Sequence, residues 1–176
     1  MHVFPIVIYQ ESPLSYDTIY SLYRYYIADI VCSNHDFNIL CDILTVNEEV
    51  LETISTGYYT LFLPPNDAFA AIEGPLDSLD EETILGVVLF HFTYGYVYVE
   101  DMYCGGLVEM LDWTYSRHSC QKKDDGSRED IYIQKGGGNR RNNLLPQIIV
   151  PNIEACNGIV HVVNHVMLPN YIPTFA

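Results

Sequence analysis

Basic residues are scarce in this chain. Only 8 Lys and Arg residues stand against 23 Asp and Glu residues in a chain of 176, which gives a formal net charge of -15 at pH 7. Nucleic acids and anionic membranes both require a basic protein surface, so the composition argues against either as a partner. An acidic surface suits cation-rich surroundings, but plain solubility is the favoured explanation.

Long apolar runs are also absent. No stretch reaches the roughly 18 residues of a membrane-spanning helix. The opening MHVFPIVIYQ has no basic region and its apolar part is broken by Pro5, so it is not typical of a signal peptide. No Asn-x-Ser/Thr sequon offers N-glycosylation as a sign of secretion. With 49% hydrophobic and 18% charged residues, the chain is expected to fold as one domain with a sizeable core.

Several motifs of enzymes and metal sites are missing as well. There is no Cys-x-x-Cys pair, no Gly-x-Ser-x-Gly turn and no alternating Asp loop for calcium. His161 and His165 are four residues apart, but they lie in a strand-like segment with no acidic residue between them. The Gly136–Gly138 triplet is followed by no Lys-Ser/Thr pair, so we expect a flexible turn rather than a phosphate loop. A small enzyme that uses His91, His161 or His165, with or without a metal, is kept as an alternative.

The first half of the chain shows helical patterns. Apolar and aromatic residues recur at helical spacing in Tyr16–Val31, which favours a packed helix face over an exposed, crosslinkable tyrosine cluster. A second helix follows the capping residues 33–36, and Asn47 is expected to cap a third. Ser78–Glu81 has the pattern of a capping box ahead of an apolar helix at Thr83–Phe92.

Past Gly105 the pattern changes to short strands separated by polar turns, which is typical of sheets built from hairpins. The last strand is too apolar to be solvated on either face. The expected strands are Leu107–Leu111, Tyr115–His118, Asp130–Ile133, Ile148–Val150 and Ile159–Val163.

The segment Thr60–Ile72, TLFLPPNDAFAAI, joins a strand to a short helix. Its Pro-Pro corner ends the strand, because proline fixes φ and the second proline has no N–H to donate. Asn66 is expected to cap the helix, and Asp67 places negative charge at the helix N-terminus. The residues that define this motif are Phe62, Pro64, Asn66, Asp67 and Phe69.

A second segment, Ala155–Pro169, reads ACNGIVHVVNHVMLP and combines a turn with the last apolar strand. The Asn157-Gly158 pair suits a turn that needs a positive φ. The residues that define this motif are Asn157, Gly158, His161 and Pro169.

Together, the two segments resemble the two homology segments of fasciclin-like domains. Between them, the Phe90-His91 pair and the Tyr94-Gly95-Tyr96 turn resemble the family's Tyr-His pair and Pro-Gly turn. The resemblance implies an α+β fold, a wedge-shaped β-sandwich of about seven short strands with helices packed along one edge. We expect an N-terminal helical extension at residues 1–31, a single fasciclin-like domain at 32–170 and a tail at 171–176.

The resemblance also implies a role and candidate contact residues. Fasciclin domains are extracellular or cell-surface modules of adhesion and matrix interaction, and in vertebrate matrix members integrin contact involves a Tyr-His region and an Asp-Ile pair. Here those positions hold Phe90-His91 and Asn152-Ile153, and the chain has no Arg-Gly-Asp, so integrin is not the expected partner. His91 is expected to be a core residue paired with Asp67.

The chain has five cysteines, so at least one lies outside any disulfide. Cys32 and Cys41 lie around a helix start, and Cys104 and Cys120 flank an expected hairpin, so both spacings could close. Some fasciclin domains have similar cysteine pairs, which favours the Cys32–Cys41 and Cys104–Cys120 disulfides with Cys156 as a buried odd thiol. The alternative is five reduced thiols in a reducing compartment.

We therefore expect a non-enzymatic, secreted or cell-surface module with no metal and no cofactor. The expected partners are a cell-surface or matrix protein, a polysaccharide or a second copy of the chain. Weak contacts multiplied by tandem copies would supply the affinity. Two alternatives stay open, namely the histidine-dependent enzyme and an intracellular scaffold with reduced thiols.

Overall fold

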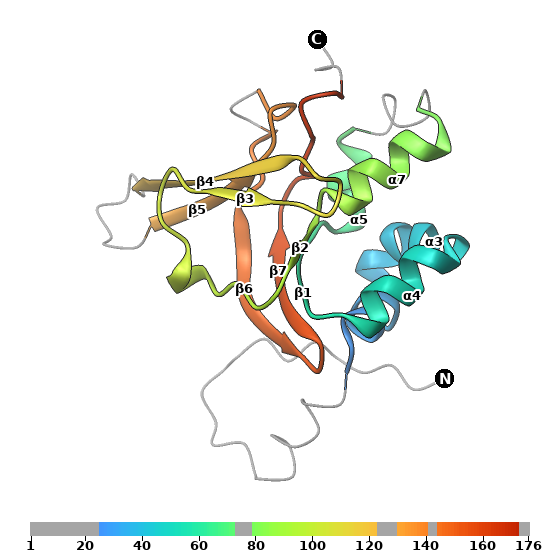
Figure 1. Ribbon diagram of the computed structural model, residues 1–176. Helices are drawn as coiled ribbons and strands as arrows, with labels where there is room; N and C mark the ends of the chain where they lie inside the picture. Colours follow the sequence, from blue (N-terminus) through green and yellow to red (C-terminus); the bar gives the residue numbers. More distant parts are fainter. Residues whose placement is uncertain (1–24, 73–78, 123–129, 141–143, 173–176) are drawn as a thin grey trace, which may run out of the picture.

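The structure is a computed structural model that describes residues 25–72, 79–122, 130–140 and 144–172. Two β-sheets form its centre, and the helices α3 (Asn38–Val46), α4 (Glu48–Thr56), α5 (Asn66–Ala70) and α7 (Glu81–Leu89) lie together on one side of them (Figure 1). Most of the helix expected at Tyr16–Val31 and all of the residues 73–78 lie outside the described residues. None of the described helices combines the length and the apolarity needed to cross a membrane.

The larger sheet has four strands in the order β2-β1-β7-β6. β1 (Tyr59–Leu63) and β7 (Gly158–Val163) run parallel at its centre, and every residue of both strands is buried. β2 (Phe92–Tyr94) pairs antiparallel with β1, and β6 (Ile148–Ala155) pairs antiparallel with β7. The prediction that the last strand is buried on both faces is confirmed.

The smaller sheet has the order β3-β4-β5, with all pairs antiparallel. Its strands are β3 (Leu107–Glu109), β4 (Tyr115–Lys122) and β5 (Asp130–Lys135), and in Figure 1 β4 and β5 run across the direction of β6 and β7. The described residues thus hold seven strands in two sheets together with helices, which confirms the expected α+β fold.

The helices are short and complete the core. In α2 (Ile27–Cys32), the side chains of Ile27 and Val31 are fully buried and belong to the same hydrophobic core as those of the larger sheet. The α-helices are α2 (Ile27–Cys32), α3 (Asn38–Val46), α4 (Glu48–Thr56), α5 (Asn66–Ala70) and α7 (Glu81–Leu89), and the 3-10 helices are η1 (His35–Phe37) and η2 (Val99–Asp101).

At three expected helix caps, the hydrogen bonds in the structure differ from those that the sequence predicted. The cap of α7 is Asp80, whose side chain accepts a hydrogen bond from the Thr83 N–H at 2.7 Å, while Ser78 of the expected capping box lies outside the described residues. Asn47 stands at the start of α4, but its side chain donates back to the Ile43 carbonyl of α3. Asn66 is the first residue of α5, and its side chain instead accepts from the Ile39 N–H, which ties α5 to α3.

The Asn157-Gly158 turn is a junction between distant elements. Asn157 is buried, and its side chain accepts a hydrogen bond from the Ile27 N–H at 2.9 Å and donates one to the Ile54 carbonyl at 2.7 Å. Gly158 has the positive φ of 157° that the sequence predicted for this turn. A Cβ atom at Gly158 would overlap the carbonyl oxygen of Tyr59, so β1 can approach β7 this closely only because the residue is glycine.

The glycine triplet forms a turn, as predicted, and this turn is closely packed against its neighbours. Gly136 and Gly138 are buried, and a Cβ at Gly136 would overlap the Leu168 carbonyl oxygen. The neighbouring Asn139 is also buried, and its side chain accepts from the Leu168 N–H and donates to the Val166 carbonyl. Because glycine has no side chain, this loop can lie directly against the segment that follows β7.

Both expected disulfides are present. The Cα atoms are 5.1 Å apart in Cys32–Cys41 and 5.4 Å apart in Cys104–Cys120. Cys156 takes part in neither disulfide, but it is exposed, so the prediction that it would be buried is wrong. It stands at the turn between β6 and β7 with Ala155 and Asn157 buried on either side, and the alternation of side chains turns it outward.

Candidate functional site

His91 is a core residue, as expected, but its partners are different. Its ring is 1% exposed; Nδ1 donates to the Val87 carbonyl at 2.7 Å, and Nε2 accepts from the Met167 N–H at 2.9 Å. Both ring nitrogens are therefore engaged, and the predicted pair with Asp67, an exposed residue, is not formed. Burial lowers the pKa of His91 to about 4, so the ring is neutral at pH 7.

Phe90 and His91, which were predicted to contact a partner, are both buried in this structure. Phe90 is fully buried and His91 nearly so, because they close the C-terminal end of α7 over the core. A partner could reach neither side chain without unfolding this end of the helix. The pair instead holds α7 to the segment that follows β7 through the His91–Met167 hydrogen bond.

Asn152 and Ile153 are half-buried in a bulged part of β6. Asn152 has a φ of 58°, a left-handed conformation that asparagine tolerates better than most residues. Its side chain accepts from the Val99 N–H at 3.0 Å and donates to the Glu100 carboxylate at 2.9 Å. Asn152 thus fastens the residues around η2 to β6, while contact of a partner with Asn152 or Ile153 stays a prediction.

His161 of β7 holds the backbones of Asn152 and Val97 in place through its two ring nitrogens. Its Nε2 donates to the Val97 carbonyl at 2.8 Å, and its Nδ1 accepts from the Asn152 N–H at 3.1 Å. The ring stacks on Phe62 at 5.4 Å between centroids, and burial is the main cause that lowers its pKa. His165 is half-buried, with Nδ1 next to the Asn164 amide oxygen. Across the described residues, no three His, Cys, Asp or Glu side chains gather as a metal site would require.

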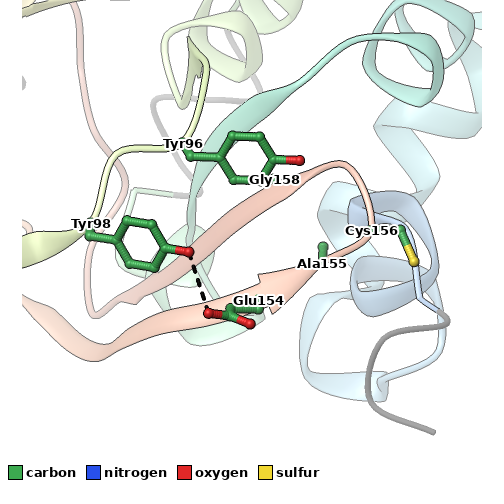
Figure 2. A pocket seen from close by; sticks show the side chains of 6 residues that line it. All are labelled: Tyr96, Tyr98, Glu154, Ala155, Cys156 and Gly158. Carbon is green, nitrogen blue, oxygen red and sulfur yellow. Dashed lines mark hydrogen bonds between the residues drawn. The ribbon is translucent and has the colours of Figure 1, made fainter. Parts of the chain in front are cut away.

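The residues that these contacts hold in place form one wall of a pocket, which we call the tyrosine pocket. It has a volume of about 400 Å³ and lies over the β6–β7 hairpin (Figure 2). Figure 2 shows Tyr96 and Tyr98 among the side chains that line the pocket, with the Tyr98 hydroxyl directed at Glu154. The residues that line it are Tyr96, Tyr98, Glu154, Ala155, Cys156 and Gly158.

The tyrosine-bearing segment is rigidly attached to the sheet. The Thr60 hydroxyl donates to the Gly95 carbonyl at 2.8 Å and accepts from the Val97 N–H at 2.9 Å. Together with the His161–Val97 bond, this fixes the backbone on both sides of Tyr96. The walls of the pocket are therefore preformed, as is usual for binding sites.

Two contacts orient the side chains of the pocket. The Tyr96 ring lies 5.6 Å from that of Tyr58, centroid to centroid, and both rings are largely exposed. The Tyr98 hydroxyl donates to Glu154 Oε1 at 3.3 Å. Loss of hydration raises the pKa of Tyr96, with smaller contributions from Tyr58 and Cys156, so this hydroxyl is neutral at pH 7. The pocket thus combines aromatic rings with one carboxylate.

Sequence reasoning missed this pocket. It recognised Tyr94-Gly95-Tyr96 as a turn but not as one wall of a site. The signal that could have found it is the alternation of Tyr94, Tyr96 and Tyr98, because three aromatic residues at a spacing of two rarely all face the core.

The comparisons with known proteins decide the family. The sequence model of the fasciclin domain matches residues 35–169. The chain belongs to the fasciclin family. Its fold is similar to that of a FAS1 domain pair from the insect cell adhesion molecule fasciclin I, with a TM-score of 0.61 and 17% identity over 77% of this chain. The match spans 46% of that two-domain chain.

Two curated relatives are more similar in sequence to this fasciclin domain. It is 26% identical to a protein named heme ligase from Plasmodium falciparum, over 78% of this chain and 73% of the relative. It is 23% identical to protein sll1483 from Synechocystis, over 81% of this chain and 73% of the relative.

Proposed function

We propose that this fasciclin domain is a non-enzymatic, extracellular adhesion or matrix-interaction module, and that the tyrosine pocket with the adjoining Tyr58 ring is its contact surface. The observation that carries the proposal is the rigid presentation of exposed tyrosines around a preformed pocket. Tyr58 is 62% exposed and Tyr96 46% exposed, although their backbones are tied to the buried sheet. Tyrosine is enriched at protein interfaces because it offers a large contact area at a small entropic cost.

Further support comes from the family and the disulfides. The fasciclin domain favours an adhesion-type module, and two disulfides are typical of an oxidising, extracellular environment. The enzyme alternative has less support. His91 and His161 are buried and use both ring nitrogens for structural hydrogen bonds, so no observation at these residues favours the activity named for the Plasmodium relative.

Beads coated with the folded domain test the proposal. Aggregation of the beads with one another would measure self-association, and capture on a panel of immobilised matrix proteins and polysaccharides would measure binding to other partners. We expect one of the two to occur and to be weakened at least fivefold by Tyr58→Ser or Tyr96→Ser. Tyr103→Ser is the matched control, because Tyr103 is 73% exposed but does not line the pocket. Equal loss in all three variants would contradict the proposed contact surface.

A further inference from the structure

The chemistry of the tyrosine pocket indicates what kind of ligand it takes. Two tyrosine rings and one carboxylate line it, and among the residues that the structure describes no basic side chain does. The face of an aromatic ring attracts cations, and Glu154 adds a full negative charge at the pocket wall. We propose that the pocket binds a Lys or Arg side chain of a basic partner protein, with its cation against the tyrosines and Glu154. This inference rests on the proposed function and names the chemistry of the partner.

The distribution of charge along the chain supports a basic partner. Seven of the eight Lys and Arg residues lie within residues 117–141, and residues 25–112 contain none. Between residues 142 and 176, Glu154 is the only Asp, Glu, Lys or Arg residue. The segments that build the pocket are therefore acidic or neutral throughout. Such a field raises the association rate of a basic partner and disfavours acidic polysaccharides.

The geometry suits a long basic side chain. A volume of about 400 Å³ is ample for one residue of a partner, and the apolar stem of Lys or Arg can lie along the rings and Ala155. The Tyr98 hydroxyl holds Oε1 of Glu154, which orients the carboxylate. An ionised carboxylate has about four acceptor positions, so the group can still accept hydrogen bonds from a guanidinium or an ammonium.

A neutral polysaccharide is the competing ligand, because sugar rings also stack on tyrosines. The two ligands differ in their need for charge. Binding of a cation depends on the carboxylate of Glu154 and weakens with salt, whereas stacking of a neutral sugar needs neither. The experiment can therefore separate them.

The test uses tetra-arginine and tetra-lysine peptides as probes and cellohexaose as the neutral sugar. Each is titrated into the isotopically labelled chain while NMR follows the backbone amides of residues 94–98 and 154–158. We expect the basic peptides to shift these amides and cellohexaose to leave them unchanged. Raising NaCl from about 0.1 M to about 1 M, which shortens the Debye length from about 10 Å to about 3 Å, should weaken peptide binding at least tenfold.

Three variants make the test specific. Glu154→Gln should weaken peptide binding about tenfold, whereas Glu109→Gln, which changes the net charge equally on an exposed residue of β3, should weaken it less than twofold. Tyr96→Leu should weaken binding about fivefold, and Tyr96→Phe, which keeps the ring, should weaken it less than twofold. Equal effects of the two Glu variants, or binding of cellohexaose that survives Glu154→Gln, would overturn the inference.

The outcomes also separate this inference from the proposed function. If the coated beads adhere through the tyrosine surface but no peptide shifts the pocket amides, the basic-partner inference fails and the adhesion proposal stands. If the peptides bind with the expected dependence on Glu154 while the beads neither aggregate nor bind any surface, the pocket chemistry is supported and the adhesion proposal fails.

Discussion

The strands of the two sheets differ in which of their residues are buried. In the four-stranded sheet, β1 and β7 are buried along their whole length, and most of their side chains are apolar. In the three-stranded sheet, the first half of β4 alternates exposed and buried residues. Several of its buried residues are polar, and Ser116 and His118 both form hydrogen bonds to Gln134 of β5. We therefore expect the larger sheet to tolerate few substitutions, whereas the smaller one holds buried polar contacts and a disulfide.

Two neighbouring tyrosines at the start of β1 show a similar contrast between a buried and an exposed side chain. Tyr58 and Tyr59 are neighbours, yet one is 62% exposed and the other 5% exposed. The first belongs to the surface that we propose for binding, and the second belongs to the central strand β1. Substitutions at these two residues can therefore separate effects on the stability of the fold from effects on binding at the surface.

The largest effect is expected at the junction of the larger sheet. Asn157→Val removes the acceptor of the Ile27 N–H and the donor to the Ile54 carbonyl, and leaves both groups buried without these partners. Each such loss costs roughly 1–3 kcal/mol, so the free energy of unfolding should fall by about 3–5 kcal/mol in urea denaturation. Asn170→Val, at an exposed asparagine, is the control and should change it by less than about 0.5 kcal/mol. A fall of less than about 1 kcal/mol in Asn157→Val would show that the junction is not essential.

Acid should weaken the core next. The pKa of His91 is about 4 in the folded domain against 6.5 for an exposed histidine, so the unfolded chain binds this proton first. Stability from His91 is complete above pH 6.5 and is lost as the pH falls from 6.5 to 4, by about 3 kcal/mol in total. Burial lowers the pKa of His118 and His161 as well, which adds to the same trend. Urea denaturation at several pH values measures this loss of stability. If NMR showed that His91 of the folded domain titrates with a midpoint near pH 6.5, the prediction would be contradicted.

Loss of a disulfide should have a similar effect in the smaller sheet. Cys104→Ala with Cys120→Ala opens a loop with a separation of 16 residues, which corresponds to about 3 kcal/mol of chain entropy. Thermal unfolding with and without this double substitution measures the cost. If the comparison of the sheets is right, the pairing of β1 with β7 survives in the variant, as amide hydrogen exchange of residues 159–163 would show. Collapse of both sheets together would mean that they are not separable.

The smallest effect is expected at the surface. Tyr58→Ser should change the free energy of unfolding by less than about 0.5 kcal/mol, because the side chain is mostly exposed. Tyr59→Ser, one residue further on, should cost about 3 kcal/mol, since it empties a large buried volume. Urea denaturation of both variants makes this comparison directly. Similar losses of unfolding free energy in the two variants would show that Tyr58 contributes to the stability of the fold as much as Tyr59 does.

The sequence was informative where a single segment determines its own structure. The apolar strand at Ile159–Val163, the corner after Phe62 and the cysteines on either side of a helix start or a hairpin are local patterns, and their structures were predicted. Asparagine was harder to interpret, because Asn66 and Asn157 bond to residues far away rather than to their own turns. The tyrosine pocket could not be predicted, since Thr60 and His161 place it through bonds to residues 35 and 64 positions distant.

The junction at Asn157 also governs when this domain can fold during its synthesis. Its side chain joins Ile54 and Ile27 across 103 and 130 residues, and β7 supplies the central partner of β1. The helices and β1 leave the ribosome before β7 has been made, so the apolar β1 has no parallel partner until nearly the whole domain has been synthesised. Non-local pairing of this kind is slow and leaves nascent chains prone to aggregation. A nascent chain that ends before residue 157 should therefore depend on chaperones, and release of the last strand is the step that completes the domain.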